Sequence, residues 1–233
     1  LARRFAEVTG NLAKTDREDA EMLARYGLLL NPRLLRQNTA AFNDLKELHV
    51  ARLALIKDRT ATSNRGKNLT QPLLRRHNAA RLKQIEAQLA QVDHLIMTLL
   101  EADEMLKTRF DIIVSIPGLS TVTAFALLIE MPELGELEDK AAAALSGLAP
   151  RDRQSGRWTR PASIAGGRAI VRRALYMPAL VAIRFNPDLK AKYDALIKAG
   201  KPPKVAITAV MRKLVILANT LLRQNRKWQP KMA

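Results

Sequence analysis

The sequence contains no cysteine, which excludes disulfide bonds and thiolate metal sites. No run of 18 apolar residues is present, and the amino-terminal stretch "LARRFAEVTG" lacks the apolar core of a signal peptide. The sequence therefore predicts a protein of a reducing, bacterial-type cytoplasm, with no membrane partner. The histidines lie too far apart along the chain for a local zinc motif; they are His49, His77 and His94.

Acidic residues are scarce in the last part of the chain. Residues 147–233 hold 19 lysines and arginines against three acids, whereas residues 1–146 hold 20 basic and 19 acidic residues. Nearly all of the net charge of +17 therefore belongs to the carboxyl-terminal part. A basic field of this density binds phosphate backbones through counterion release, which favours nucleic acid as the partner. An anionic membrane surface is the weaker alternative, because no basic amphipathic helix with an aromatic apolar face is evident.

The chain does contain helical patterning, and its 233 residues suffice for one or two domains with a buried core. We expect a short helix over residues 1–9. A second helix should begin near Asp16, where Thr15 and Glu18 form a capping box, and should end at Gly27.

Two long segments without internal proline or glycine, residues 38–62 and 73–107, predict two long helices. In the second, apolar residues recur at alternating three- and four-residue steps, as in a coiled coil. This seam, which only Asp103 interrupts, consists of Leu82, Ile85, Leu89, Val92, Ile96, Leu99 and Leu106. The intervening "TSNRGKNLTQP" predicts a chain reversal. The pattern is compatible with an antiparallel hairpin and with a seam shared between two copies.

The segment "IPGLSTVTAFALLIE" predicts a tight turn at Pro117 and Gly118, followed by an apolar helix that Ser120 caps. Backbone N–H groups at such a helix start accept phosphate, so the segment is similar to a helix-hairpin-helix element that grips DNA backbone. An ordinary helix connection inside a core is the equal alternative.

The rest of the chain is also expected to be helical. A short helix should end at Gly147, and a proline at position 178 should kink a later one. The three helices expected in the tail run over about 168–184, 187–199 and 204–225.

Ser155 lies in the basic stretch "APRDRQSGRWTRP". No histidine is nearby in sequence, so a Ser-His-Asp hydrolase is disfavoured. Guanidinium groups hold a phosphodiester and stabilise charge on a transferring phosphoryl group, which makes Ser155 a candidate nucleophile. The alternative is a Ser-Gly turn within a basic binding loop. The surrounding arginines are Arg151, Arg153, Arg157 and Arg160.

Other candidate site residues lie on expected helices. Asp16 and Asp19 share one face of a first helical turn, where they can bind one Mg²⁺ or simply offset the helix dipole. A second set follows a glycine pair and is expected to contact phosphate, with a solvated face as the alternative; it consists of Arg168, Arg172 and Arg173. Trp158 and Trp228 can each stack on a base or cap a core.

Four segments in order, "AKTDREDAEMLA", "IPGLSTVTAFALLIE", "LSGLAPRDRQSGRW" and "GGRAIVRRALYMPALVAIRFNP", closely resemble the transposases of the insertion sequence 110 family, also labelled 116/902. The resemblance covers essentially the whole chain. It implies a mainly α fold in three parts: the remnant of an RNase H/RuvC-like domain (1–36), long antiparallel coiled-coil helices (37–110), and a helical, serine-containing basic domain with a helix-hairpin-helix-like element (111–233).

The resemblance also implies a mechanism. Asp16 and Asp19 match the last two of four family acids that hold Mg²⁺, and Ser155 matches a serine that attacks DNA to form a phosphoserine link. Family members are understood to use a structured guide RNA, which would delegate sequence choice to base pairing. The implied protein is a nucleoid-associated DNA recombinase that works as a homo-oligomer, a dimer or a tetramer.

One departure from the family pattern concerns the metal site. The first two acids should lie upstream of Leu1, so the chain is expected to be an amino-terminally truncated form that binds Mg²⁺ weakly. We therefore expect it to bind nucleic acid and to recombine poorly. The alternative from another functional class is a non-catalytic helical nucleic-acid-binding protein.

Overall fold

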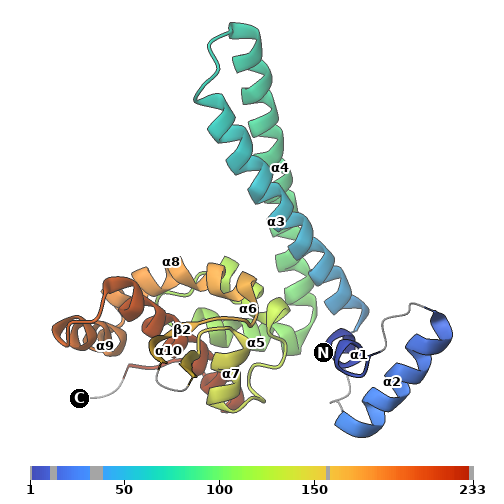
Figure 1. Ribbon diagram of the computed structural model, residues 1–233. Helices are drawn as coiled ribbons and strands as arrows, with labels where there is room; N and C mark the ends of the chain where they lie inside the picture. Colours follow the sequence, from blue (N-terminus) through green and yellow to red (C-terminus); the bar gives the residue numbers. More distant parts are fainter. Residues whose placement is uncertain (1, 11–14, 32–38, 156–157, 231–233) are drawn as a thin grey trace. The chain divides into compact units, whose positions relative to one another are not determined.

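The computed structural model describes residues 2–10, 15–31, 39–155 and 158–230; the side chains at 2 and 152–161 are outside the description. The described chain is mainly helical, as predicted, and separates into two compact units, residues 1–39 and 40–233 (Figure 1). Its elements are α1 (Ala2–Val8), α2 (Asp16–Leu30), α3 (Ala40–Gly66), α4 (Pro72–Ala102), α5 (Glu104–Val114), α6 (Thr121–Glu130), α7 (Asp139–Leu145), β1 (Pro150–Ser155), β2 (Trp158–Ile164), α8 (Ala169–Phe185), α9 (Pro187–Lys198) and α10 (Pro203–Arg223).

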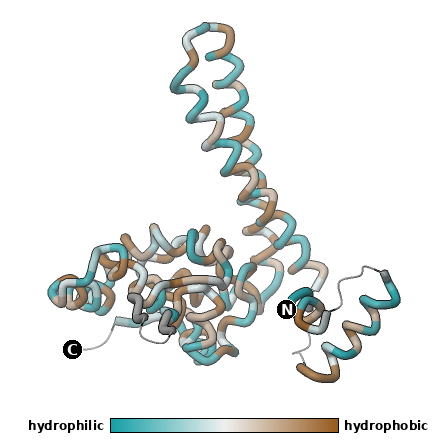
Figure 2. Tube along the Cα trace, in the orientation of Figure 1, coloured by the Kyte–Doolittle hydropathy of each residue, from teal (hydrophilic) through white to brown (hydrophobic). Residues whose placement is uncertain are grey.

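The first unit consists of α1 and α2, which meet through an edge-to-face contact between Phe5 and Tyr26, 5.5 Å between ring centroids. The predicted start of α2 is confirmed, because the Thr15 hydroxyl accepts a hydrogen bond from the Glu18 N–H. The predicted end at Gly27 was wrong. The helix continues to Leu30, and Asn31 takes the left-handed cap position with its N–H on the Gly27 carbonyl. Figure 2 shows the apolar carboxyl end of α2.

The two long helices that begin the second unit are α3 and α4, which pack side by side as a helical hairpin (Figure 1). The predicted seam residues of α4 face inward: Ile85, Leu89 and Ile96 are buried. Apolar residues every three or four positions thus join α4 to its neighbour.

The seam of α4 does not continue as one helix to residue 107, so that prediction was wrong. The helix ends at Ala102, and Asp103 adopts an extended backbone conformation. The Asp103 carboxylate then accepts a hydrogen bond from the Leu106 N–H at 3.0 Å and begins α5. The interruption of the seam is therefore a helix cap, because a short acid accepts from the free N–H groups of a helix start.

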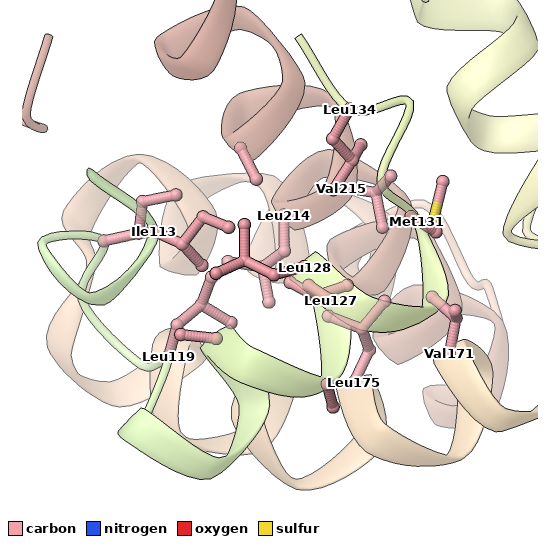
Figure 3. Close-up of a cluster of buried hydrophobic side chains, with 14 of the residues drawn as sticks. Ile113, Leu119, Leu127, Leu128, Met131, Leu134, Val171, Leu175, Leu214 and Val215 are labelled. Carbon is pink, nitrogen blue, oxygen red and sulfur yellow. The ribbon is translucent and has the colours of Figure 1, made fainter. Parts of the chain in front are cut away.

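The core of the second unit is formed by α5, α6, α8 and α10 (Figure 3). Leu127 of α6 and Leu175 of α8 are fully buried, and Leu214 of α10 lies in the same cluster. Burying such side chains contributes roughly 1.5–3 kcal/mol each, so this cluster is the main source of stability in the unit.

Helix α10 is, among the described residues, the one helix long and apolar enough to cross a membrane by length and composition. It packs against α5, α7, α8 and α9. Apolar side chains along the helix are buried in that packing, from Ala206 near one end to Leu221 near the other. The composition of α10 is therefore that of a central core helix.

The carboxyl-terminal helices confirm the predicted bounds within a few residues. The basic stretch between α7 and α8, for which a Ser-Gly turn in a binding loop was one alternative, forms an antiparallel hairpin of β1 and β2. No strand was predicted there, because "WTRPASI" alternates between apolar and polar residues only over its last three positions, contains Pro161 and is flanked by helical patterns. Trp228 packs against the core and donates its backbone N–H to the Ser115 hydroxyl at 2.8 Å, so it acts as a core cap.

Candidate nucleic-acid interface

Ser155 ends strand β1, and its backbone lies opposite Trp158 at the start of β2. The same register places Arg153 opposite Arg160. The hairpin thus gathers the basic stretch onto two adjacent strands, although the side chains of Arg153, Ser155 and Arg160 lie outside the described residues, as does Arg157 altogether. Their predicted contacts stay predictions.

The base of the β1–β2 hairpin contains an irregularity in register between Arg151 and Arg153. Such a bulge bends the strand and changes the direction in which the neighbouring side chains point. Arg151 is exposed, and its guanidinium lies against Gly166, where an added Cβ would be 2.9 Å from the arginine Nη2. This contact joins β1 to the segment that leads into α8.

The segment that leads into α8 lies close to the end of α7 at Gly167. The φ of Gly167 is +60°, and an added Cβ would clash with the backbone nitrogen of Gly147 and lie 2.7 Å from the Leu145 carbonyl oxygen. The Arg168 N–H donates to the same Leu145 carbonyl at 2.8 Å. Because β1 and β2 lie between these two points in the chain, the junction holds the two ends of the hairpin together.

Arg168 is not on the helix, where it had been expected, but precedes it as the N-cap of α8. Its guanidinium donates two hydrogen bonds to the Glu133 carboxylate, at 2.7 and 2.6 Å, and a third to the Glu130 carbonyl. The bonds to Glu133 raise the pKa of Arg168 above its ordinary value. The charge of Arg168 is thus largely balanced within the fold, and the residue joins α8 to the end of α6.

Arg172 and Arg173, both on α8 as expected, have different surroundings. Arg172 donates to the Gly166 carbonyl and strengthens the glycine junction. Arg173 is exposed, and no hydrogen bond or ion pair joins its side chain to another residue in the described ranges. Of the three arginines, Arg173 is the best placed to meet an external phosphate.

The predicted turn at Gly118 packs against α8. The φ of Gly118 is +102°, and an added Cβ would lie 2.7 Å from the Ala182 Cβ. Ser120 is exposed and caps α6 by accepting from the Thr123 N–H at 3.4 Å, as predicted. Core packing is therefore one sufficient reason for the glycine, and phosphate binding at this turn stays a prediction.

Asp16 and Asp19 are exposed in the first turn of α2, with Glu18 engaged by the Thr15 hydroxyl at 3.0 Å. Within the described parts of the chain, no group of three or more acidic or histidine side chains is placed to hold a metal ion. Mg²⁺ needs several fixed oxygen ligands, and two exposed carboxylates on one turn do not supply them. The described residues therefore do not make a metal site by themselves.

Comparison with known proteins identifies the family. A family model described as "Transposase IS116/IS110/IS902 family" matches residues 111–194, and a second model, described as a transposase, matches residues 1–77. Pilin gene-inverting proteins of Moraxella bovis and Moraxella lacunata are each 31% identical over 242 residues, covering 98% of this chain and 72% of the relative. The chain belongs to the IS116/IS110/IS902 transposase family.

The regions that the two family models match contain the predicted site residues. The region matched at residues 111–194 contains the β1–β2 hairpin, the glycine junction and the Gly118 turn. The region matched at residues 1–77 contains Asp16 and Asp19. Transposases act in DNA recombination, so DNA is the partner that membership in the family implies.

Proposed function

We propose that this transposase-family protein exchanges DNA strands through Ser155. The observation that carries the proposal is the β1–β2 hairpin: it places Ser155 at the closing end of two arginine-bearing strands whose base is held by the glycine junction. A rigid base supports the proposal because a nucleophile must be held in a fixed geometry relative to the scissile phosphate.

In the proposed step, the Ser155 Oγ attacks the phosphorus of a DNA phosphodiester. A phosphoserine bond forms and the serine hydroxyl gives up its proton, while the bond from phosphorus to one sugar oxygen breaks and that oxygen takes up a proton and leaves as a hydroxyl. Reversal of this step with a second DNA end would join new strands. Arginine side chains would stabilise the charge on the phosphoryl group; the candidates are Arg151, Arg153, Arg157 and Arg160.

Asp16 and Asp19 are proposed as part of a Mg²⁺ site, as the family resemblance implies. Such an ion would stabilise the developing negative charge. We assign it no step, because the described residues supply only these two exposed carboxylates. A structured guide RNA and assembly of a dimer or tetramer through a coiled coil of α3 and α4 complete the proposal, together with a cytoplasmic, nucleoid-associated location.

The three-part division into residues 1–36, 37–110 and 111–233, with an RNase H/RuvC-like remnant first, also belongs to the proposal. The exposed leucines of α2 support it, since Leu28 and Leu29 are 85% and 72% exposed. Neighbouring exposed leucines at one end of a helix are typical of a surface that packs on another element.

The test is a covalent-adduct assay with Ser155→Ala and, as a matched control, Ser163→Ala. Ser163 is an exposed serine of the same hairpin, opposite Arg151. With a suicide DNA substrate and the cognate RNA, wild type and Ser163→Ala should form a denaturation-resistant protein–DNA adduct, and Ser155→Ala should not. An adduct that persists in Ser155→Ala would exclude Ser155 as the nucleophile.

A non-catalytic nucleic-acid-binding protein is the second candidate function. The observation that favours it is the lack of a three-ligand metal cluster among the described side chains. It predicts salt-dependent binding of DNA by the wild-type protein with no adduct under any condition.

A further inference from the structure

A cavity of about 560 Å³ lies between α3, α6 and α8, apart from the β1–β2 hairpin. Its volume is within the roughly 300–1,000 Å³ of pockets that take small organic ligands. Most of the wall is apolar, and no acidic side chain lines it. The lining residues that determine its chemistry are His49, Arg52, Lys57, Phe125, Ile170 and Arg173.

His49 is the buried polar group of this cavity, with only 2% of its surface exposed. Its Nε2 lies 3.4 Å from the Glu130 Oε1, yet neither ring nitrogen has a hydrogen-bond partner among the described residues. Burial, and then the charge of Arg52, lower the pKa of His49 to about 4. The ring is therefore neutral at pH 7, and its one donor and one acceptor lie just beneath the cavity wall without a partner among the described residues, which is uncommon for buried polar groups.

Arg52 forms a fixed part of the wall. Its guanidinium donates to both oxygens of the Asp93 carboxylate, at 2.5 and 3.3 Å, and lies over the Phe125 ring, 5.2 Å from its centroid. The ion pair neutralises Arg52, and the aromatic contact holds its plane. The inner wall of the cavity therefore carries no unbalanced charge at Arg52.

The outer part of the cavity is positively charged. Lys57 of α3 and Arg173 of α8 are exposed, and in the described ranges neither side chain has a hydrogen bond or ion pair. A matching occupant has a planar, largely apolar part joined to an anionic group. A nucleotide has this combination, because its base has a flat face that packs on apolar and aromatic side chains and its phosphate is anionic.

We propose that this cavity binds a single unpaired nucleotide of the nucleic acid on which the protein acts, with the base against the wall that contains Phe125 and His49 and the phosphate at Lys57 and Arg173. The inference rests on the proposed function, since a strand must be bound before one of its nucleotides can enter. The base leaves its stack to reach the pocket, so a single-stranded or distorted segment is the preferred source.

A pocket-filling variant tests the proposal without changing any charge. Ala54 is an exposed residue of α3 that lines the cavity. The larger side chain of Ala54→Trp should therefore fill the space in which we propose that the base binds. Ala61→Trp is the matched control, because Ala61 is exposed on the same helix two turns further on and outside the cavity. Denaturant unfolding of both variants confirms that they fold.

The measurement combines fluorescence anisotropy with NMR signals of the histidine rings, using a single-stranded DNA oligonucleotide and, separately, deoxyadenosine monophosphate. DNA should shift the ring signals of His49 but not those of His77 or His94. Ala54→Trp should abolish the shift and weaken DNA binding about tenfold, whereas Ala61→Trp should change neither.

Each other outcome overturns a defined statement. If DNA binds and the His49 signals do not move, the pocket proposal fails and the proposed function stands. If the mononucleotide shifts them and DNA does not, the ligand is a free nucleotide and the strand proposal fails. If the wild-type protein binds no DNA, the proposed function fails, and the pocket proposal fails with it.

Discussion

Arg168 and Arg173 lie five residues apart at the start of α8, yet they belong to different electrostatic regions. Arg168 donates hydrogen bonds to the Glu133 carboxylate and the Glu130 carbonyl, whereas Arg173 is exposed at the opening of a cavity. A charge that is balanced inside the fold contributes to stability, and one that faces solvent is available to a polyanion. Positive charge in the sequence therefore does not by itself identify a nucleic-acid contact.

The same distinction applies to other basic residues of the carboxyl-terminal part. Lys227 lies 3.3 Å from a carboxylate oxygen of Asp111, and Arg223 donates to the Leu137 carbonyl. Both residues thereby attach the end of the chain to the helical body. Substitutions can therefore separate residues that stabilise the fold from residues that face a ligand.

The largest effect is expected at the glycine junction, where the backbones at Gly167 and Gly147 are in close contact. Gly167→Ala should destabilise the protein by about 3 kcal/mol, because the methyl group adds a clash with the Gly147 backbone to an unfavourable φ. Gly200→Ala is the control: its φ is +73°, but an added Cβ has no neighbour within 4 Å, so about 1 kcal/mol is expected. Equal free energies of unfolding for the two variants would contradict a tight junction.

The next largest effect is expected at the ion pair between Arg168 and Glu133. Arg168→Met should lower the free energy of unfolding by about 2 kcal/mol, because Glu133 would keep a half-buried charge without its bidentate partner. Arg173→Met should change stability by no more than about 0.5 kcal/mol. Denaturant unfolding of both variants measures the contrast, and similar losses would show that the two arginines are not distinct.

A pH-dependent effect is expected at the buried wall of the cavity. Because the pKa of His49 is lowered to about 4, its contribution to stability is complete above about pH 6.5, the unfolded value, and is lost as the pH falls toward 4. Between pH 7.5 and pH 5 this loss should be about 1–2 kcal/mol, with the nearby Glu130 reducing it.

His49→Gln keeps a polar group but cannot titrate, so its unfolding free energy should fall less over the same interval. Titration of carboxylates is common to both proteins and cancels in the difference. Parallel curves for wild type and His49→Gln would show that the ring protonates as readily in the folded state as in the unfolded chain.

The smallest effect is expected for one exposed cation. Arg173→Gln should weaken DNA binding by about tenfold or less and reduce the salt dependence of binding by about one counterion. Arg168→Gln should leave the salt slope nearly unchanged, because its charge is already matched by Glu133. Anisotropy titrations over a range of salt concentrations measure both slopes, and a larger change for Arg168 would reverse the comparison.

Elements whose ends carry local signals could be predicted from the sequence. Thr15 and Ser120 were identified as caps and accept the expected N–H bonds. The break at Asp103 was seen as a flaw in the seam but not as a helix start, because a cap and a polar interruption look alike in sequence. The β1–β2 hairpin was missed for a related reason: its short strands compete with strong helical patterns on both sides.

The sequence by itself determined where most helices begin and end and where positive charge gathers, since capping, glycine, proline and apolar spacing act over a few residues. Only the tertiary structure decided which charges are balanced and which groups enclose a cavity. Arg168 and Glu133 are 35 positions apart, and Arg52 and Asp93 are 41 apart. Such pairs exist only after the helices pack, because their energy depends on burial and on distances that no local pattern encodes.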